Sequence, residues 1–140
     1  PRRCAWYDGV VARYSARING LDGLALTKLD VLDGLDEIKI CTAYNIGGRE
    51  VTEFPADLAS AGPCEPIYET MPGWKEPTRG ARSWDDLPRE ARKYVDRLQD
   101  VSGVPVSIVS TGSDREETSI LTGSVAQKWI GTRTRFTGLA

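Results

Sequence analysis

A short apolar strand predicted at residues 24–29 ends in the polar sequence Thr-Lys-Leu-Asp, and this ending constrains the chain more than any other feature. The carboxylate of Asp30 can accept two hydrogen bonds side by side, from the N1–H and the exocyclic amino group of guanine. Adenine lacks this donor pair, so a buried aspartate rejects it by leaving a charge unpaired. On an extended strand Lys28 points to the same face, where its methylene stem can lie on the base. The alternative is a strand that ends by chance in a solvated lysine and aspartate.

A second apolar strand is predicted at residues 104–109, and Ser110, Thr111 and Gly112 follow it directly. If the two strands lie parallel in one sheet, both polar endings emerge at the carboxyl edge, where open α/β sheets bind ligands. Ser110 can then hydrogen-bond the O6 side of guanine, and Gly112 lets the backbone approach the ring closely. An ordinary turn is the alternative interpretation of Ser-Thr-Gly.

Two segments have the periodicity of amphipathic helices. Residues 8–19 carry apolar side chains on one face of a 3.6-residue period, and the aspartate that opens this segment is the predicted N-cap. Residues 89–101 form the clearest helix, which Asp85 or Asp86 is predicted to cap and Gly103 to end. The apolar stripe of this helix comprises Leu87, Ala91, Tyr94, Val95 and Leu98.

Three further segments, at residues 37–44, 50–54 and 67–70, are rich in β-branched and aromatic side chains and are predicted as strands. A glycine-containing turn at residues 45–48 joins the first two as a hairpin. The chain therefore contains both predicted helices and predicted strands. We expect an α/β fold with a partial mixed sheet and flanking helices.

The composition excludes several classes of partner. The 40% of hydrophobic residues and 27% of charged residues are values typical of a globular chain of one domain. The 18 basic and 20 acidic residues leave a net charge of −2, which gives no basic surface for nucleic acid or an anionic membrane. No apolar run approaches the roughly 20 residues that a membrane-spanning helix needs.

Two absences limit the chemistry that this sequence can carry out. It contains no histidine, so it has neither a Ser-His-Asp nor a Cys-His device. It contains no G-x-x-x-x-G-K-[ST] phosphate loop. The three cysteines, Cys4, Cys41 and Cys64, lie far apart and are predicted to be free thiols in a reducing cytoplasm.

Four segments together resemble the adenylosuccinate synthetases. They are residues 17–41, which include the Thr-Lys-Leu-Asp sequence, residues 66–74, residues 103–112, and the arginine-rich stretch at residues 2–6. The resemblance covers residues 1–120 and matches only the carboxyl-terminal third of such an enzyme. The chain is therefore expected to be a fragment of a larger single-domain enzyme, and its start at a proline fits that expectation.

Residues 121–140 depart from the family. They are rich in threonine and glycine, carry no acidic residue and show no sustained periodicity. The family normally ends soon after this point with a short tail of different sequence. The domain is accordingly predicted to span residues 1–120, and residues 121–140 are expected to be an atypical, poorly ordered tail.

The resemblance implies a ligase of purine biosynthesis. Such an enzyme uses GTP and Mg²⁺ to join inosinate (IMP) and L-aspartate into adenylosuccinate, and works in the cytoplasm, as a homodimer when full length. Its phosphate loop, magnesium-binding aspartate and catalytic histidine belong to the amino-terminal portion. The present chain is therefore expected to recognise guanine and to be inactive alone.

The resemblance also implies particular site residues. Arg2 matches the arginine that reaches the nucleotide and borders the aspartate pocket, and Arg3 is its less certain neighbour. The family has a proline where this chain has Ser113, which is expected to loosen the wall on the purine. The residues implied to bind GTP are Arg2, Lys28, Leu29, Asp30, Ser110, Thr111 and Gly112, and Arg2 is also implied to bind substrate.

Other polar and aromatic residues have simpler interpretations. Asp33 is predicted to be a turn residue, residues 114–117 a solvated run of charge, and Trp6, Trp74 and Trp84 packing residues. Two alternatives to the ligase stay open. One is a guanine-nucleotide-binding module without catalysis, and the other is an interaction domain that binds no nucleotide.

Overall fold

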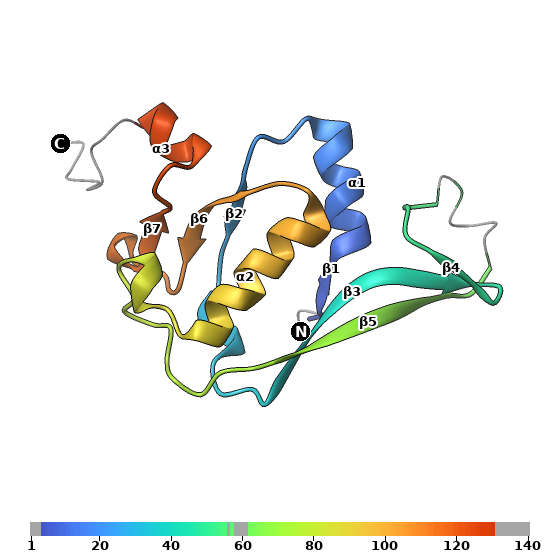
Figure 1. Ribbon diagram of the computed structural model, residues 1–140, viewed down its shortest axis with the longest axis horizontal. Helices are drawn as coiled ribbons and strands as arrows, with labels where there is room; N and C mark the ends of the chain where they lie inside the picture. The colour runs from blue at the N-terminus through green and yellow to red at the C-terminus, as the bar shows by residue number, and fades with distance from the viewer. Residues whose placement is uncertain (1–3, 56, 58–61, 131–140) are drawn as a thin grey trace.

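A computed structural model describes residues 4–55, 57 and 62–130, which form two small mixed sheets with helices between and around them (Figure 1). The predicted α/β class is confirmed, although the strands form two sheets and not one. The strands are β1 (Tyr7–Asp8), β2 (Leu24–Leu26), β3 (Glu37–Ile46), β4 (Arg49–Val51), β5 (Cys64–Pro72), β6 (Val106–Ser110) and β7 (Thr118–Ile120). The helices are α1 (Gly9–Asn19), α2 (Arg89–Ser102) and α3 (Val125–Ile130), with 3-10 turns η1 (Leu29–Leu32), η2 (Trp84–Asp86) and η3 (Arg115–Glu117).

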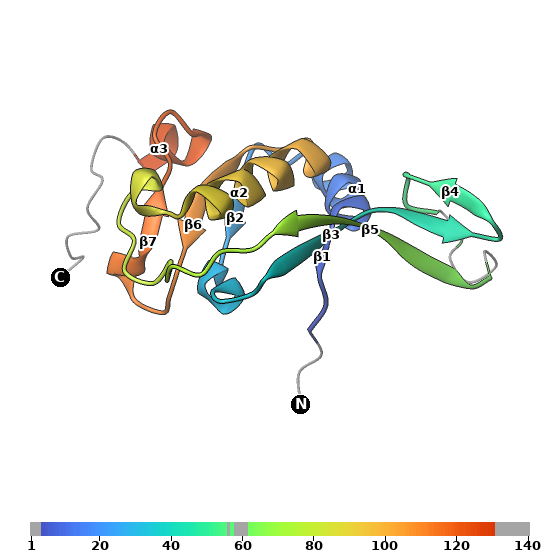
Figure 2. The ribbon, with the colours of Figure 1, turned by 60° about the horizontal axis from the view of Figure 1, so that its bottom comes forward.

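Strand β3 organises the first sheet. It pairs in parallel with β1, and it pairs antiparallel with β5 along its whole length, from Glu37 opposite Pro72 to Ile46 opposite Cys64. Strand β4 forms a hairpin with the end of β3, and Figure 2 shows this end of the ribbon projecting from the rest of the molecule. Both β3 and β5 are longer than predicted, because pairing between them extends into residues whose own composition is weak for strands.

The second sheet consists of β2, β6 and β7. Strands β2 and β6 are parallel neighbours, with Leu24 opposite Val106 and Leu26 opposite Val109, and β7 pairs antiparallel with β6. The predicted parallel arrangement of these two apolar strands is therefore confirmed. Strand β2 ends at residue 26, earlier than predicted, because the chain turns there into η1.

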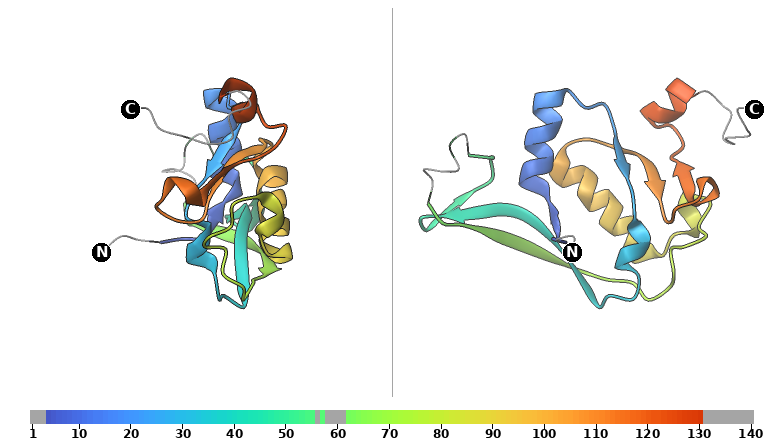
Figure 3. Two further views of the ribbon diagram at one scale, coloured as in Figure 1. Left: turned by 90° about the vertical axis from the view of Figure 1, so that its left-hand side faces the viewer. Right: turned by 180° about the vertical axis from the view of Figure 1, so that it is seen from behind.

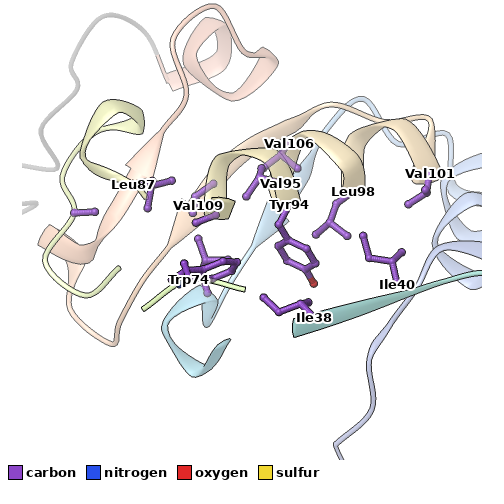
Figure 4. Close-up of a cluster of buried hydrophobic side chains, with 13 residues drawn as sticks. Ile38, Ile40, Trp74, Leu87, Tyr94, Val95, Leu98, Val101, Val106 and Val109 are labelled. Carbon is purple, nitrogen blue, oxygen red and sulfur yellow. The ribbon is translucent and has the colours of Figure 1, made fainter. Parts of the chain in front are cut away.

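Helix α2 packs its apolar stripe between the two sheets and forms the main core (Figure 4). The predicted stripe is confirmed, and burial of each valine or leucine side chain in it contributes roughly 1.5–3 kcal/mol. Trp74 stacks at a tilt on Tyr94, with ring centroids 5.9 Å apart, so its predicted packing role is confirmed. The core comprises Leu29, Ile38, Ile40, Trp74, Ala81, Leu87, Ala91, Tyr94, Val95, Leu98, Val101, Val106 and Val109.

The predicted ends of the two long helices are largely correct. Asp8 caps α1, and Gly20 closes it in the left-handed conformation with φ 60°. Gly103 ends α2 in the same way, with φ 71° and its N–H on the carbonyl of Gln99. These positions favour glycine because a β-carbon is strained at such a φ.

The predicted cap of α2 is wrong. Pro88 occupies the N-cap position, and neither Asp85 nor Asp86 caps the backbone N–H groups of the first turn of α2, although Asp85 accepts from the Arg92 side chain at 3.4 Å. Asp86 instead accepts the backbone N–H groups of positions 82 and 83 at 3.0 and 2.9 Å and closes η2. These bonds hold the pKa of the Asp86 carboxyl below its usual value. Proline suits the start of a helix because it has no N–H to satisfy there.

Residues 121–130 were expected to be poorly ordered, but Val125–Ile130 within this range form the short helix α3. This helix buries Ala126, and the N–H of Leu121 bonds to the carbonyl of Ser107 in β6 at 2.9 Å. Figure 3 shows α3 on the opposite side of the second sheet from η1. Residues 131–140 lie outside the described residues, and a domain boundary at residue 120 stays a prediction. None of the described helices has the length and apolar character to cross a membrane.

The N-cap of α1 yields a first test. Asp8 accepts the N–H groups of Val10 and Val11 at 3.0 Å each and the hydroxyl of Tyr44 at 2.6 Å. Asp8→Ala removes all three bonds, so it should lower the free energy of unfolding by about 1–2 kcal/mol, measured by urea denaturation. Asp22→Ala, at an exposed loop position, is the control. Equal losses in the two variants would contradict the capping role.

Candidate functional site

The polar endings of β2 and β6 meet at one edge of the second sheet. Because Leu26 pairs with Val109, the chain leaves both strands at the same level. Figures 1 and 2 show η1, which follows β2, beside the turn between β6 and β7. The structure therefore brings Lys28 and Asp30 to the same edge as Ser110 and the residues that follow it, as the sequence predicted.

Lys28 has the most unusual backbone at this edge. Its φ of 61° and ψ of 40° lie in the left-handed region, and it alone among the described non-glycine residues has a positive φ. Such a conformation costs roughly 1–2 kcal/mol for a residue with a β-carbon. It turns the chain from β2 into η1, where Leu29 is buried in the core. The predicted extended strand through Lys28 and Asp30 is therefore wrong, although both residues remain at the edge.

Asp30 lies half-buried in the first turn of η1. Its backbone carbonyl accepts the N–H of Asp33 at 3.2 Å. Its carboxylate has neither a hydrogen bond nor an ion pair with another described residue. A partly buried carboxylate without a partner is costly unless something else supplies donors. Both oxygens of Asp30 therefore remain available to accept from a ligand.

The Ser-Thr-Gly turn is built by its own hydrogen bonds. The Ser110 hydroxyl donates to the carbonyl of Gly112 at 2.9 Å and accepts from the Thr118 hydroxyl at 3.3 Å. The N–H of Thr111 donates to the carbonyl of Glu117 at 2.9 Å. Ser110 and Thr111 are both buried, at 8% and 3% exposed. The turn is thus a rigid, closed structure, and the Ser110 hydroxyl already has partners within it.

The sequence predicted that Glu117 belongs to a solvated run of charge, and this prediction is wrong. Its side chain is only 14% exposed, and it accepts from the N–H of Asp114 at 3.1 Å and from Arg79 Nε at 3.2 Å. The first of these bonds is the main reason that the pKa of Glu117 falls below its usual value. A β-carbon at Gly112 would lie 1.9 Å from this carboxylate. Glu117 therefore supplies a physical reason for glycine at position 112 besides the predicted approach of a base.

Asp33 is a structural acceptor that sequence reasoning reduced to a turn residue. Its carboxylate accepts the indole N–H of Trp74 at 2.6 Å and both the N–H and the hydroxyl of Thr78, at 2.8 and 2.9 Å. These partners are more than 40 positions away along the chain, so no local pattern identifies them. Asp33 and Asp30 thus have opposite environments, although only two residues separate them.

The predicted pair of arginines is not placed by the structure. Arg2 and Arg3 lie outside the described residues, so the implied contacts with nucleotide and substrate stay predictions. Within the described ranges, no group of three histidine, cysteine, aspartate or glutamate side chains is arranged to hold a metal ion.

A separate cavity of about 340 Å³ lies beside β1 and β3. Asp8 faces it, but its oxygens are already bonded to the first turn of α1 and to Tyr44. Cys41 also lines it, and burial raises the pKa of this thiol to about 11. A neutral thiol is a poor nucleophile, so Cys41 is not an activated group for chemistry in this cavity.

Comparisons with known proteins show the family of this chain. The family model for adenylosuccinate synthetase matches residues 1–119. Adenylosuccinate synthetase of Magnetococcus marinus is 56% identical over 121 residues, and the chloroplastic adenylosuccinate synthetase 1 of Ricinus communis is 57% identical over 120 residues. The fully ligated structure of the Plasmodium falciparum adenylosuccinate synthetase superposes with a TM-score of 0.80 at 33% identity. The chain belongs to the adenylosuccinate synthetase family.

These matches cover most of this chain but only a small part of each relative. Each covers 86% of this chain. The chain spans only 28% and 27% of the two relatives by sequence, and 29% of the Plasmodium falciparum chain. The family membership therefore concerns one part of the fold of its relatives.

The backbone of Lys28 gives a second test. The free energy of unfolding should be higher for Lys28→Gly than for Lys28→Ala by about 0.5–1 kcal/mol, because only glycine relieves the left-handed strain. Urea denaturation of both variants measures the difference. At Lys39, in the extended strand β3, the order of glycine and alanine should reverse. The same order at both positions would contradict strain at Lys28.

The buried thiol gives a third test. Burial favours the neutral form of Cys41, so at pH 8 almost none of it is the reactive thiolate. Iodoacetamide at pH 8 should label the exposed Cys4 and spare Cys41, and labelling of Cys41 should rise only as the pH approaches about 11. Mass spectrometry locates the label, and urea-unfolded chain is the control. Equal labelling of both thiols in the folded chain at pH 8 would be the contrary result.

Proposed function

We propose that this chain supplies the guanine-recognition part of a GTP-dependent ligase that joins IMP and L-aspartate into adenylosuccinate. Membership of the adenylosuccinate synthetase family supports the reaction class. The observation that carries the guanine assignment is Asp30, a half-buried carboxylate with no described partner at the carboxyl edge of a mixed sheet. A carboxylate in that setting matches the paired N1–H and N2–H donors of guanine.

The remaining site residues take supporting roles in this proposal. The exposed Lys28 lays its stem along the base, while the buried Leu29 anchors η1 in the core. The closed turn at residues 110–112 presents backbone groups toward the O6 side. Since the Ser110 hydroxyl already donates to Gly112 and the Thr111 N–H to Glu117, the backbone N–H of Gly112 is a better candidate than either as a donor to O6.

The proposal places catalysis outside the present residues. The chain has no histidine and no phosphate loop, so it should not form adenylosuccinate alone. Arg2 would reach the nucleotide and the aspartate pocket. Mg²⁺ and IMP would be held mainly by other parts of a cytoplasmic, dimeric enzyme. Base recognition without phosphate contacts reaches only the millimolar range, on the order of −4 kcal/mol.

A nucleotide titration tests the guanine assignment. The chain should respond saturably to GTP and not to ATP, followed by tryptophan fluorescence with circular dichroism as the check on folding. Asp30→Asn replaces an acceptor with an amide that can donate to the C2 carbonyl of xanthine. This variant should lose roughly ten- to a hundredfold in GTP affinity and gain affinity for XTP.

Asp22→Asn is the matched control, since it removes an exposed carboxylate at the other end of β2. It should leave the preference for GTP unchanged. If Asp30→Asn keeps the same preference for GTP over XTP, then Asp30 does not read the base. A folded chain that never distinguishes GTP from ATP would count against the proposed function itself.

A further inference from the structure

The segment at residues 74–79 is far in sequence from both polar motifs, but it is hydrogen-bonded to the structure around each of them. At one end, Trp74 and Thr78 make three hydrogen bonds to the carboxylate of Asp33. The N–H of Asp33 in turn bonds to the carbonyl of Asp30 at 3.2 Å. This end of the segment therefore holds the turn that carries the proposed guanine acceptor.

The other end of the same segment contacts the Ser-Thr-Gly turn. Arg79 Nε donates to Glu117 Oε1 at 3.2 Å. The Glu117 carboxylate packs against Gly112, and its backbone carbonyl accepts from Thr111 at 2.9 Å. Thr78 bonds to Asp33, and the adjacent Arg79 bonds to Glu117. These two neighbouring residues therefore link Asp33 to Glu117.

The segment is itself fixed in place. Trp74 and Thr78 are 2% and 0% exposed. The N–H of Gly34 bonds to the carbonyl of Trp74, and the N–H of Gly73 bonds to the carbonyl of Asp36, both at 2.9 Å. A β-carbon at Gly73 would lie 2.2 Å from the carbonyl oxygen of Leu35. The chain at residues 73–74 therefore approaches the chain at residues 34–36 as closely as glycine allows. Such close packing leaves the segment little freedom to shift.

We propose that residues 74–79, here called the bridging segment, position the two halves of the guanine site relative to one another. This inference rests on the proposed function. Base-edge recognition requires acceptor and donor groups to be held within about 0.5 Å of their productive places by neighbouring packing and hydrogen bonds. Arg79 and Asp33 are positioning residues in this arrangement, since they act through Glu117 and through η1, and neither needs to touch the nucleotide.

The exposure of Arg79 makes the inference testable without unfolding the chain. Its side chain is 66% exposed, and an exposed ion pair contributes little to stability. Arg79→Gln should therefore leave the fold intact while loosening the link to Glu117. The readout is the ratio of GTP to ITP affinity, because ITP lacks the 2-amino group that a correctly placed Asp30 detects. This ratio should fall about three- to tenfold in the variant, measured by calorimetric titration.

Arg17→Gln is the matched control. Arg17 is 61% exposed and bonds to Glu53 at 3.0 Å, on the far side of α1 from the site. Thr78→Val is a second variant, which removes one donor to Asp33 and keeps the shape of the side chain. It should lower the same ratio, and circular dichroism checks that each variant is folded.

The outcomes separate this inference from the proposed function. A lower ratio in Arg79→Gln and Thr78→Val, with Arg17→Gln unchanged, supports the bridging segment. A wild-type chain that prefers GTP, with variants that match the Arg17 control, overturns the positioning role and leaves the proposed function standing. A folded wild-type chain that binds GTP and ITP equally overturns both.

Discussion

The parallel pairing of β2 with β6 is the interaction on which the rest of the site depends. It places Leu26 opposite Val109, and so it brings two polar sequences about 80 positions apart to one edge. Parallel strands need a long crossover connection, and here the connection contains β3, β4 and β5 of the first sheet together with α2. The core under α2 then fixes the edge, because its side chains come from both sheets. The separation of the two polar turns therefore depends on the whole core as well as on the residues that link the turns directly.

Two aspartates, Asp30 in η1 and Asp33 at its C-cap, lie in opposite hydrogen-bonding environments. Asp33 has three donors and holds Trp74 and Thr78, so its hydrogen-bonding capacity is used by the protein. Asp30 has no described partner and lies half-buried at the edge. Sequence reasoning described Asp33 only as a turn residue, and its assignment of Asp30 as a base reader stays a prediction. Only the structure reveals that the second aspartate supports the loop of the first.

Local patterns predicted what depends on neighbouring residues in the chain. The apolar stripe of α2, its end at Gly103 and the cap of α1 at Asp8 all follow from helical periodicity and terminal chemistry. The full length of β5 depends on its partner β3, and α3 depends on burial of Ala126, so neither was predicted. Glu117 was misassigned for the same reason, because its partner Arg79 is 38 positions away.

In the proposed function, selectivity for guanine and affinity for the nucleotide come from different parts of the enzyme, as the composition of this chain indicates. Selectivity between purines needs one well-placed acceptor and a rigid wall, and both can be built from residues 28–30 and 110–117. Affinity for a nucleotide comes largely from its phosphates, which need glycine-rich loops, helix ends or clustered cations. The sequence has no phosphate loop, and Lys28 is the one basic residue of the described site sequences at 28–30 and 110–112. In the proposed function, a guanine reader of this kind would choose the base correctly and bind it weakly, so tight binding would come from contacts beyond this edge.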